Sequence, residues 1–259
     1  MRAGGEADSA GIPWAGRAFR PNPDAGDDGA ADPAVLAALG AFRDGSAGLP
    51  EVVAALHGSR LLLPLVAEAG DEGVGPHGQR VDKTQELALV TVAGPDGRAT
   101  LPAFTSVATL AAWNREARPI PIASSRVALA LGAEQTPLLV IDPGSPSRLV
   151  LRRPAFRALA TGEAWVPPWD DPEVREAVRG AARAEPAVRA IALEPGDPAA
   201  DLTGPDLRIA LALDPGLDTD ALQGLLGRLT AAWAEDALLA ERADALGVRL
   251  VAATSSPTP

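Results

Sequence analysis

The chain has 259 residues, a formal net charge of −11 and no cysteine. A negative field of this size repels phosphate backbones and anionic membranes, so neither nucleic acid nor membrane is expected as a partner. The missing thiols exclude disulfides, thiolate catalysis and zinc–thiolate sites, and the length allows one large domain or two modest ones.

The apolar runs are also too short to cross a bilayer. The amino terminus lacks the apolar core and cleavage site of a secretory signal. We therefore expect a cytoplasmic protein.

The first part of the chain is predicted to be an extended arm followed by two helices and a strand. Residues 1–32 are rich in Gly, Pro and Asp, which favour turns over regular structure. Asp32 and Pro33 then supply an N-cap and a first-turn proline. The expected elements are a helix over 33–45, a helix over 50–58 and a strand over 60–66. Pro64 places that strand at an edge or a bulge, and residues 68–82 are predicted to be a polar, glycine-rich loop.

Two β-hairpins are predicted where apolar runs flank turn residues. The turn sequences are Gly94-Pro95-Asp96-Gly97 and Asp142-Pro143-Gly144. The paired strands would cover 86–93 with 98–104, and 138–141 with 149–151. Helices are expected beside them over 105–113, 124–131 and 154–160, the last closed by Gly162.

Residues 163–172, which contain two tryptophans and two adjacent prolines, are predicted to be a linker between domains. This linker is either open to proteases or, if Trp165 and Trp169 are buried, a rigid clasp. The elements expected after it are a helix over 172–183, strands over 187–193 and 207–213, a long helix from about 219 and a strand over 247–252. Residues 254–259 have nothing to bury and are predicted to be a disordered tail.

The pattern indicates an α/β protein of the α+β type. We expect two small mixed domains, over 33–162 and 173–253, with hairpin-containing sheets covered by helices.

No motif for catalysis, a cofactor or a metal is recognisable. His57 and His77 are the only histidines, and we interpret both as structural residues. We therefore expect no catalytic, cofactor-binding or metal-ligating residue, and no enzymatic activity.

Three features remain as candidates for binding. The arm carries an aromatic and basic island, the segment 82–86 contains the only lysine, and a local run of arginines stands out on an acidic protein. The candidate interaction residues are Trp14, Phe19, Lys83, Gln85, Arg148, Arg152, Arg153 and Arg157. Two of these features also have a non-functional interpretation. Lys83 would form a surface ion pair, and the arginines would form a solvated face.

Four stretches together resemble a known family. They are W-A-G-R at Trp14–Arg17, D-K-T-Q-E at Asp82–Glu86, P-A-F-T-S-V at Pro102–Val107 and W-V-P-P-W at Trp165–Trp169. In order and spacing they resemble an actinobacterial SseB-family protein, named for enhanced serine sensitivity. The resemblance implies SseB-like N-terminal and C-terminal domains before and after the linker, and it supplies no catalytic residues.

Two functions are compatible with these observations. The first is a non-enzymatic protein-interaction or regulatory module with a protein partner. The alternative is a sensor of an amino acid or other anionic metabolite, which would use the arginine run or the 82–86 segment in a pocket. A hydrolytic enzyme is a distant third possibility.

Overall fold

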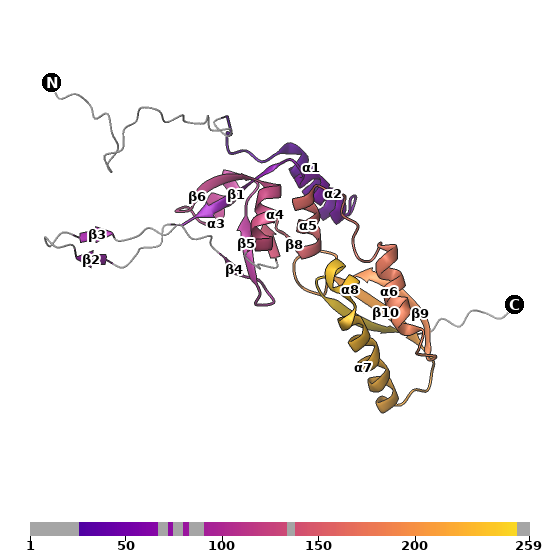
Figure 1. Ribbon diagram of the computed structural model, residues 1–259. Coiled ribbons are helices and arrows are strands. Elements are labelled where there is room, and N and C mark those ends of the chain that lie inside the picture. The colour runs from indigo at the N-terminus through magenta and orange to yellow at the C-terminus, as the bar shows by residue number, and fades with distance from the viewer. Residues whose placement is uncertain (1–25, 67–71, 75–79, 83–90, 134–137, 253–259) are drawn as a thin grey trace, which may run out of the picture.

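The structure is a computed structural model that describes residues 26–66, 72–74, 80–82, 91–133 and 138–252. Within these residues, helices and short strands form a mixed α+β fold, which confirms the predicted fold class (Figure 1). The strands form four small sheets of two to four strands each. In Figure 1, the elements up to α5 (Arg153–Thr161), apart from β2 and β3, lie in one group, and those from α6 (Pro172–Ala182) onward lie beside it. None of the described helices is both long enough and apolar enough to span a membrane.

The first two helices begin and end within two residues of their predicted bounds. α1 (Pro33–Arg43) is capped by Asp32, whose carboxylate accepts the N–H of Ala34 at 2.8 Å. α2 (Leu49–Leu56) is followed by Gly58, whose φ of 82° turns the chain into β1 (Arg60–Leu65).

β1 pairs antiparallel with β6 (Arg118–Ala123) in a two-stranded sheet, and Pro64 lies opposite Pro119. On its other edge β1 is bonded only through the bridge between Leu62 and Phe104. Because proline has no N–H to give to a ladder, Pro64 suits a position on this edge beyond the bridge, as predicted.

A four-stranded sheet forms the centre of the first group. Its strands, in spatial order, are β4 (Val92–Ala93), β5 (Ala99–Ala103), β7 (Leu138–Ile141) and β8 (Leu149–Arg152). β5 and β7 run parallel, while β4–β5 and β7–β8 are the two predicted hairpins. Gly97 and Gly144, each at φ 80°, form the turns, which confirms that part of the prediction.

The same group contains three more helices, which are α3 (Val107–Trp113), α4 (Ser124–Ala133) and α5. Ser106 caps α3 by accepting the N–H of Thr109 at 3.1 Å. Ser124, the first residue of the helix predicted over 124–131, lies buried, and its hydroxyl donates to the carbonyl oxygens of Leu56 and Ser59. This contact ties the start of α4 to the end of α2.

Three elements differ from the prediction. β6 was not expected, because Pro119 and Pro121 break its apolar alternation and only its partner β1 selects the extended form. Part of the predicted loop 68–82 pairs as a short hairpin of β2 (Glu72–Val74) and β3 (Arg80–Asp82). α8 (Ala237–Arg242) was also missed, since Asp236 ends one helix and caps the next without any intervening Gly or Pro.

The second group is a three-stranded sheet packed against helices. β10 (Leu207–Leu213) lies between β9 (Val188–Pro195), which is antiparallel to it, and β11 (Leu246–Val251), which is parallel. α6, α7 (Thr219–Glu235) and α8 bury their apolar residues against it. Trp233 is the largest side chain in this core, and its indole N–H donates to the carbonyl of Val178 at 3.2 Å.

The predicted linker packs closely between the two groups. Pro167 and Pro168 are buried, and the half-buried rings of Trp165 and Trp169 meet edge to face with centroids 6.2 Å apart. Trp165 packs against the first core and Trp169 against the second. The two rings are half-buried and not deeply buried, so the choice between an open linker and a rigid clasp stays a prediction, as do the domain bounds.

Because Trp233 fills the centre of the second core, Trp233→Ala should lower the free energy of unfolding by about 3 to 5 kcal/mol. Urea denaturation followed by circular dichroism measures this loss. Leu250→Ala, at a side chain that is 45% exposed, is the control and should change it by less than about 0.5 kcal/mol. Equal effects of the two substitutions would contradict the assigned core.

Candidate functional site

The loop between β9 and β10, residues 196–206, reaches from the second group onto the sheet of the first. Ala200 and Leu202 have positive φ values of 50° and 66°, which non-glycine residues adopt only when their surroundings hold them there. The N–H of Val150 in β8 donates to the carbonyl of Ala200 at 2.7 Å. The Leu202 side chain is buried against Leu138 and Val140 of β7 and against Val150.

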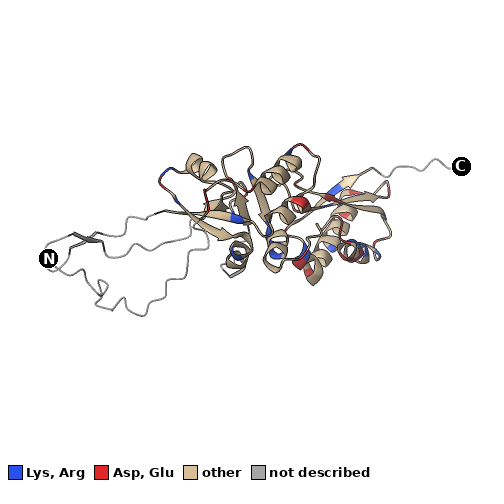
Figure 2. Cartoon of the chain, turned by 90° about the horizontal axis from the view of Figure 1, so that it is seen from above, with Lys and Arg blue, Asp and Glu red and all other residues tan. Residues whose placement is uncertain are grey.

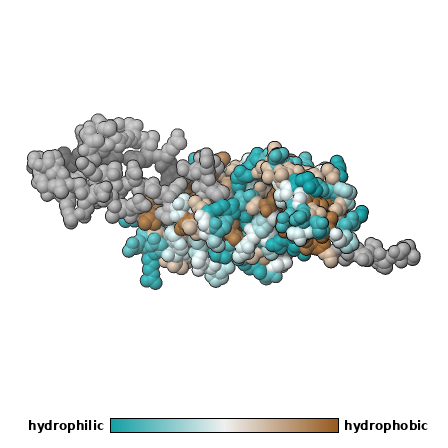
Figure 3. Space-filling model, turned by 90° about the horizontal axis from the view of Figure 1, so that it is seen from below, coloured by the Kyte–Doolittle hydropathy of each residue, from teal (hydrophilic) through white to brown (hydrophobic). Residues whose placement is uncertain are grey.

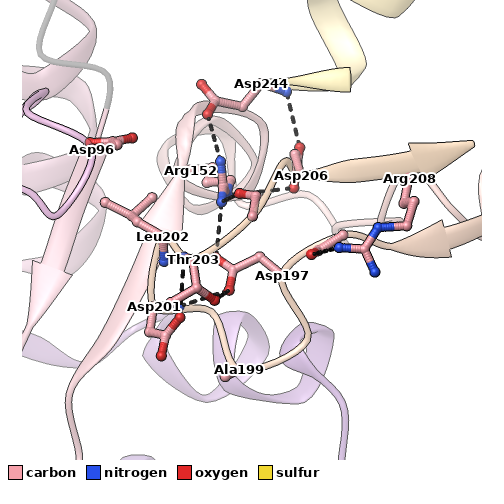
Figure 4. Close-up of polar contacts among 12 residues, drawn as sticks. Asp96, Arg152, Asp197, Ala199, Asp201, Leu202, Thr203, Asp206, Arg208 and Asp244 are labelled. Atoms are coloured by element: carbon pink, nitrogen blue, oxygen red, sulfur yellow. Dashed lines mark hydrogen bonds and ion pairs between the residues drawn. The ribbon is translucent and has the colours of Figure 1, made fainter. Parts of the chain in front are cut away.

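The carboxylate of Asp197 holds this loop in shape. It accepts the N–H of Leu202 at 2.8 Å, the N–H of Asp201 at 3.3 Å and the hydroxyl of Thr203 at 3.2 Å. Figure 4 shows these contacts around the end of β8. The loop is therefore fixed at the position where it meets the first group.

Arg152, at the end of β8, is the centre of the joint between the two groups (Figure 4). Its guanidinium donates to Asp197 at 2.9 Å, to Asp244 at 3.1 Å and to the carbonyl of Gly204 at 2.6 Å. Asp206 lies 4.0 Å away. Arg152 is 7% exposed, so this is a buried cation whose partners all come from the second group. We call Arg152 with Asp197, Asp206 and Asp244 the arginine clamp.

The other predicted arginines line the same joint. Arg153 donates to the carbonyl of Ala240 at 2.5 Å, Arg157 pairs with Glu241 at 2.6 Å, and Arg148 pairs with Asp201 at 3.5 Å. The structure thus brings all four together, but as contacts with the second group. They do not form the free anion-binding patch that one form of the sensor hypothesis uses, and residues 83–86 of its other site lie outside the described residues.

The clamp contains more negative than positive charge. Three carboxylates face Arg152, and Arg98 is the second cation, pairing with Asp244 at 2.8 Å. Burial raises the pKa of Asp206 to about 6, helped by the charges of Asp244 and Asp197 and opposed by the hydrogen bond from the Asp244 N–H and by the charge of Arg152. Asp206 therefore gains a proton at a higher pH than Asp197 does.

Asp197 behaves in the opposite way. Its burial acts to raise its pKa, but the hydrogen bonds from Arg152, Leu202 and Asp201 outweigh burial and leave the pKa lowered. Asp197 therefore remains the ionised partner of Arg152 after Asp206 has been protonated.

A groove lies next to the joint, between α2 and the end of α5. It has a volume of about 390 Å³. Its lining residues include Pro50, Val53, Ala54, His57, Leu159 and Trp165. Val53 and Leu159 are buried, whereas Ala54 and His57 are exposed, so the groove opens outward over an apolar floor. We call it the α2–α5 groove.

Gly162 closes one end of the α2–α5 groove. It has φ 78°, which ends α5, and a β-carbon at this position would come within 3.0 Å of the His57 ring. The chain therefore needs glycine here both for its backbone angle and for its close contact with the imidazole. His57 contributes to the wall of the groove, in addition to its place at the end of α2.

Two acidic side chains border the α2–α5 groove. Glu51 accepts the N–H of Gly48 at 3.0 Å, and Glu163 accepts the hydroxyl of Thr161 at 3.2 Å. Among the residues that the structure describes, neither carboxylate pairs with a cation. The groove is therefore apolar within and negative at its border.

The remaining candidate residues, Trp14, Phe19, Lys83 and Gln85, lie outside the described residues. Sequence reasoning also missed the acidic half of the clamp, Asp197, Asp206 and Asp244. The only signal was that Asp197 and Asp206 flank the Gly- and Pro-containing stretch 198–205. Asp244 offers no comparable signal.

Among the described residues, no metal-binding group is present. No group of three or more His, Asp or Glu side chains among them is placed to hold a metal ion. The most polar buried cluster outside the clamp surrounds Asp142, which accepts hydrogen bonds from Thr105 and Ser147 and joins the ends of β5 and β7. Asp142 is fully buried, so its carboxylate needs hydrogen bonds from the protein. The hydroxyls of Thr105 and Ser147 supply them and thereby stabilise the loops after β5 and β7.

Comparison with known proteins gives a match in the first group. Residues 34–158 match the family model of the SseB protein N-terminal domain. The match covers just under half of the chain, and it shows that this segment is similar to that domain. The chain gives no match to a curated protein.

The SseB-matching segment contains the four arginines of the joint and the α2 side of the α2–α5 groove. The carboxylates that face Arg152, and the linker that completes the groove, lie after it. Both features therefore depend on the rest of the chain as well.

Replacing the central cation tests the clamp. Arg152→Met should lower the free energy of unfolding by about 3 to 5 kcal/mol, because buried carboxylates lose their partner. Arg157→Met is the matched control, since its pair with Glu241 is exposed and contributes at most about 1 kcal/mol. Urea denaturation of both variants measures the difference, and similar losses would contradict a central role for Arg152.

The pKa of Asp206 predicts a pH dependence. Because the folded-state pKa is about 6 and the ordinary value is 3.8, the stabilisation from the protonated form is complete below about pH 4. It is lost as the pH rises to about 6, a change of about 3 kcal/mol.

Asp206→Asn should remove this loss. The free energy of unfolding of the wild type, relative to that of the variant, should fall between pH 4 and pH 7.5. Urea denaturation at each pH measures it. Below pH 4, Asp197, whose pKa is lowered, makes the protein less stable as the pH falls. Measurements below pH 4 are therefore left out of the comparison. Parallel pH profiles of the two proteins would refute the assignment.

Proposed function

We propose that this chain is a cytoplasmic, non-enzymatic protein-interaction module of the SseB type, and that it binds its partner through the α2–α5 groove. The groove is the observation that carries the proposal, because an open apolar floor beside a half-buried tryptophan is typical of protein docking sites. As part of the same proposal, residues 173–253 are an SseB-like C-terminal domain.

The surroundings of the α2–α5 groove support docking. The arginine clamp fixes the second group beside it, and the linker residues Glu163–Trp165 form one of its walls. A partner would therefore meet a surface that is already formed. Elsewhere, on the face in Figure 3, hydrophobic residues occur in small groups among hydrophilic ones, and Figure 2 shows basic and acidic residues interspersed along the described elements.

A small-molecule sensor is the second candidate, and the groove volume favours it to a limited degree. About 390 Å³ lies at the lower end of the range for ligand pockets. The acidic border and apolar floor would suit a cationic or aromatic ligand better than the anionic metabolite expected from the sequence. The four arginines are engaged in the joint, so they do not support an anion site.

Filling the α2–α5 groove tests the proposal. Ala54→Trp places a large ring in the groove at an exposed helical position and should change stability by less than about 0.5 kcal/mol. Affinity capture from lysate, followed by binding measurements with the captured protein, should show a loss of affinity of about tenfold or more.

Ala232→Trp, at an exposed position in α7 away from the groove, is the matched control and should keep wild-type affinity. Equal affinities of the two variants would refute the groove as the docking site. A thermal-shift screen distinguishes the sensor hypothesis from the protein-docking hypothesis, since a ligand at 100 times its Kd adds about 2.7 kcal/mol of stability. Such a shift, lost only in Ala54→Trp, would replace the protein partner with a small molecule.

A further inference from the structure

The α2–α5 groove has a chemistry that selects its occupant. Val53, Leu159 and Trp165 offer apolar surface, and Glu51 and Glu163 stand at the border without a cation among the described residues. An aromatic side chain would bury apolar area on the floor, and a neighbouring arginine could pair with a border carboxylate. A segment that carries an aromatic residue close to arginine fits both requirements.

The chain contains such a segment. Trp14, Arg17, Phe19 and Arg20 lie within seven residues of one another in a stretch that is otherwise small or polar. This stretch is positively charged in a chain whose net charge is −11. It is therefore complementary to the α2–α5 groove in both charge and hydrophobicity.

The described structure anchors the chain just after this segment. Arg60 donates to the Asp27 carboxylate at 2.5 and 2.8 Å and to the carbonyl of Ala30 at 2.5 Å. Gly29 adds a backbone contact, accepting the N–H of Val107 at 2.9 Å. The hydrogen bond from Arg60 lowers the pKa of Asp27 to about 2, so this pair stays charged at neutral pH.

This anchor lies near the α2–α5 groove. Arg60 is three residues after His57, a lining residue, so their α-carbons are at most about 11 Å apart. Trp14 precedes Gly26, the first described residue, by twelve residues, which span up to about 40 Å when extended. Trp14 can therefore reach the groove within one molecule.

We infer that the α2–α5 groove binds the chain's own segment Trp14–Arg20, with the Trp14 ring over Val53 and Leu159 and Arg17 beside Glu51 or Glu163. The inference rests on the proposed function in that the same groove serves as a docking surface. An external partner with an aromatic residue beside a basic one then competes with this segment. A short tether gives an effective concentration in the millimolar range, so even a weak contact is populated.

Proteolysis of the full-length protein tests this inference without any partner. An arginine-specific protease can cut after Arg17, whereas Arg20 is followed by a proline and resists cleavage. The bound segment should be cut slowly. The double variant Glu51→Lys with Glu163→Lys should speed cleavage after Arg17 by about tenfold, and Trp14→Ala should do the same, because both remove contacts of the segment.

The control is Glu116→Lys with Glu235→Lys, which changes the net charge equally at two exposed positions outside the groove. It should leave the rate after Arg17 unchanged, and cleavage after Arg2 serves as an internal reference. Equal rates for the wild type, the groove variants and the control would overturn the inference. Protection that increases with protein concentration would mean that the segment comes from a second copy, which would also overturn it.

The two proposals fail separately. If the segment is cut at the same rate in all variants while Ala54→Trp still loses its partner, the groove is a docking site for an external protein alone. If the cleavage rates differ as expected but no captured protein depends on Ala54, the interaction function fails and the intramolecular contact remains.

Discussion

The arrangement of the two groups depends on the buried contact between Arg152 and three carboxylates. A guanidinium that is 7% exposed has lost its water and must regain hydrogen bonds from the protein. It regains them from Asp197, Asp244 and the carbonyl of Gly204, all of which come from the second group. Any displacement of the second group that kept this cation or its carboxylates buried would leave them unpaired. The charge therefore specifies one relative position more strictly than apolar packing alone.

The same contact explains why the loop between β9 and β10 has an unusual backbone. Asp197 is both a partner of Arg152 and the acceptor for the N–H groups of Asp201 and Leu202. One carboxylate thus couples the loop conformation to the joint, and it supports the positive φ angles of Ala200 and Leu202. The cost is a carboxylate out of water, since burial, helped by the charges of Asp244 and Asp197, raises the pKa of Asp206. Folding and pH are therefore linked at this joint.

The position of the joint also determines what the surface can bind. Four arginines that look like an anion site in the sequence pair with acidic side chains and carbonyl groups of the second group. The α2–α5 groove, by contrast, has border carboxylates that are free of ion pairs within the described structure. The surface next to the joint therefore favours cationic and aromatic groups, although the arginine run had suggested an anionic ligand. Trp165 connects the first core with the α2–α5 groove, because it packs against that core and lines the groove.

Local chemistry in the sequence determined much of the fold. Several caps and turns could be predicted, because the contacts that form them are made with neighbours only a few positions away. The residues that form them are Asp32 with Pro33, Ser106, Gly97, Gly144 and Gly162. The helix α8 and the strand β6 could not, because Asp236 has two roles and the prolines of β6 are tolerated only beside β1. The arginine run was visible, but its meaning was not. Asp197 and Asp244 are 45 and 92 residues away from Arg152, and only the folded chain brings them together. The sequence determines local backbone preference and charge, whereas the tertiary structure decides which charges are paired and which remain available for binding.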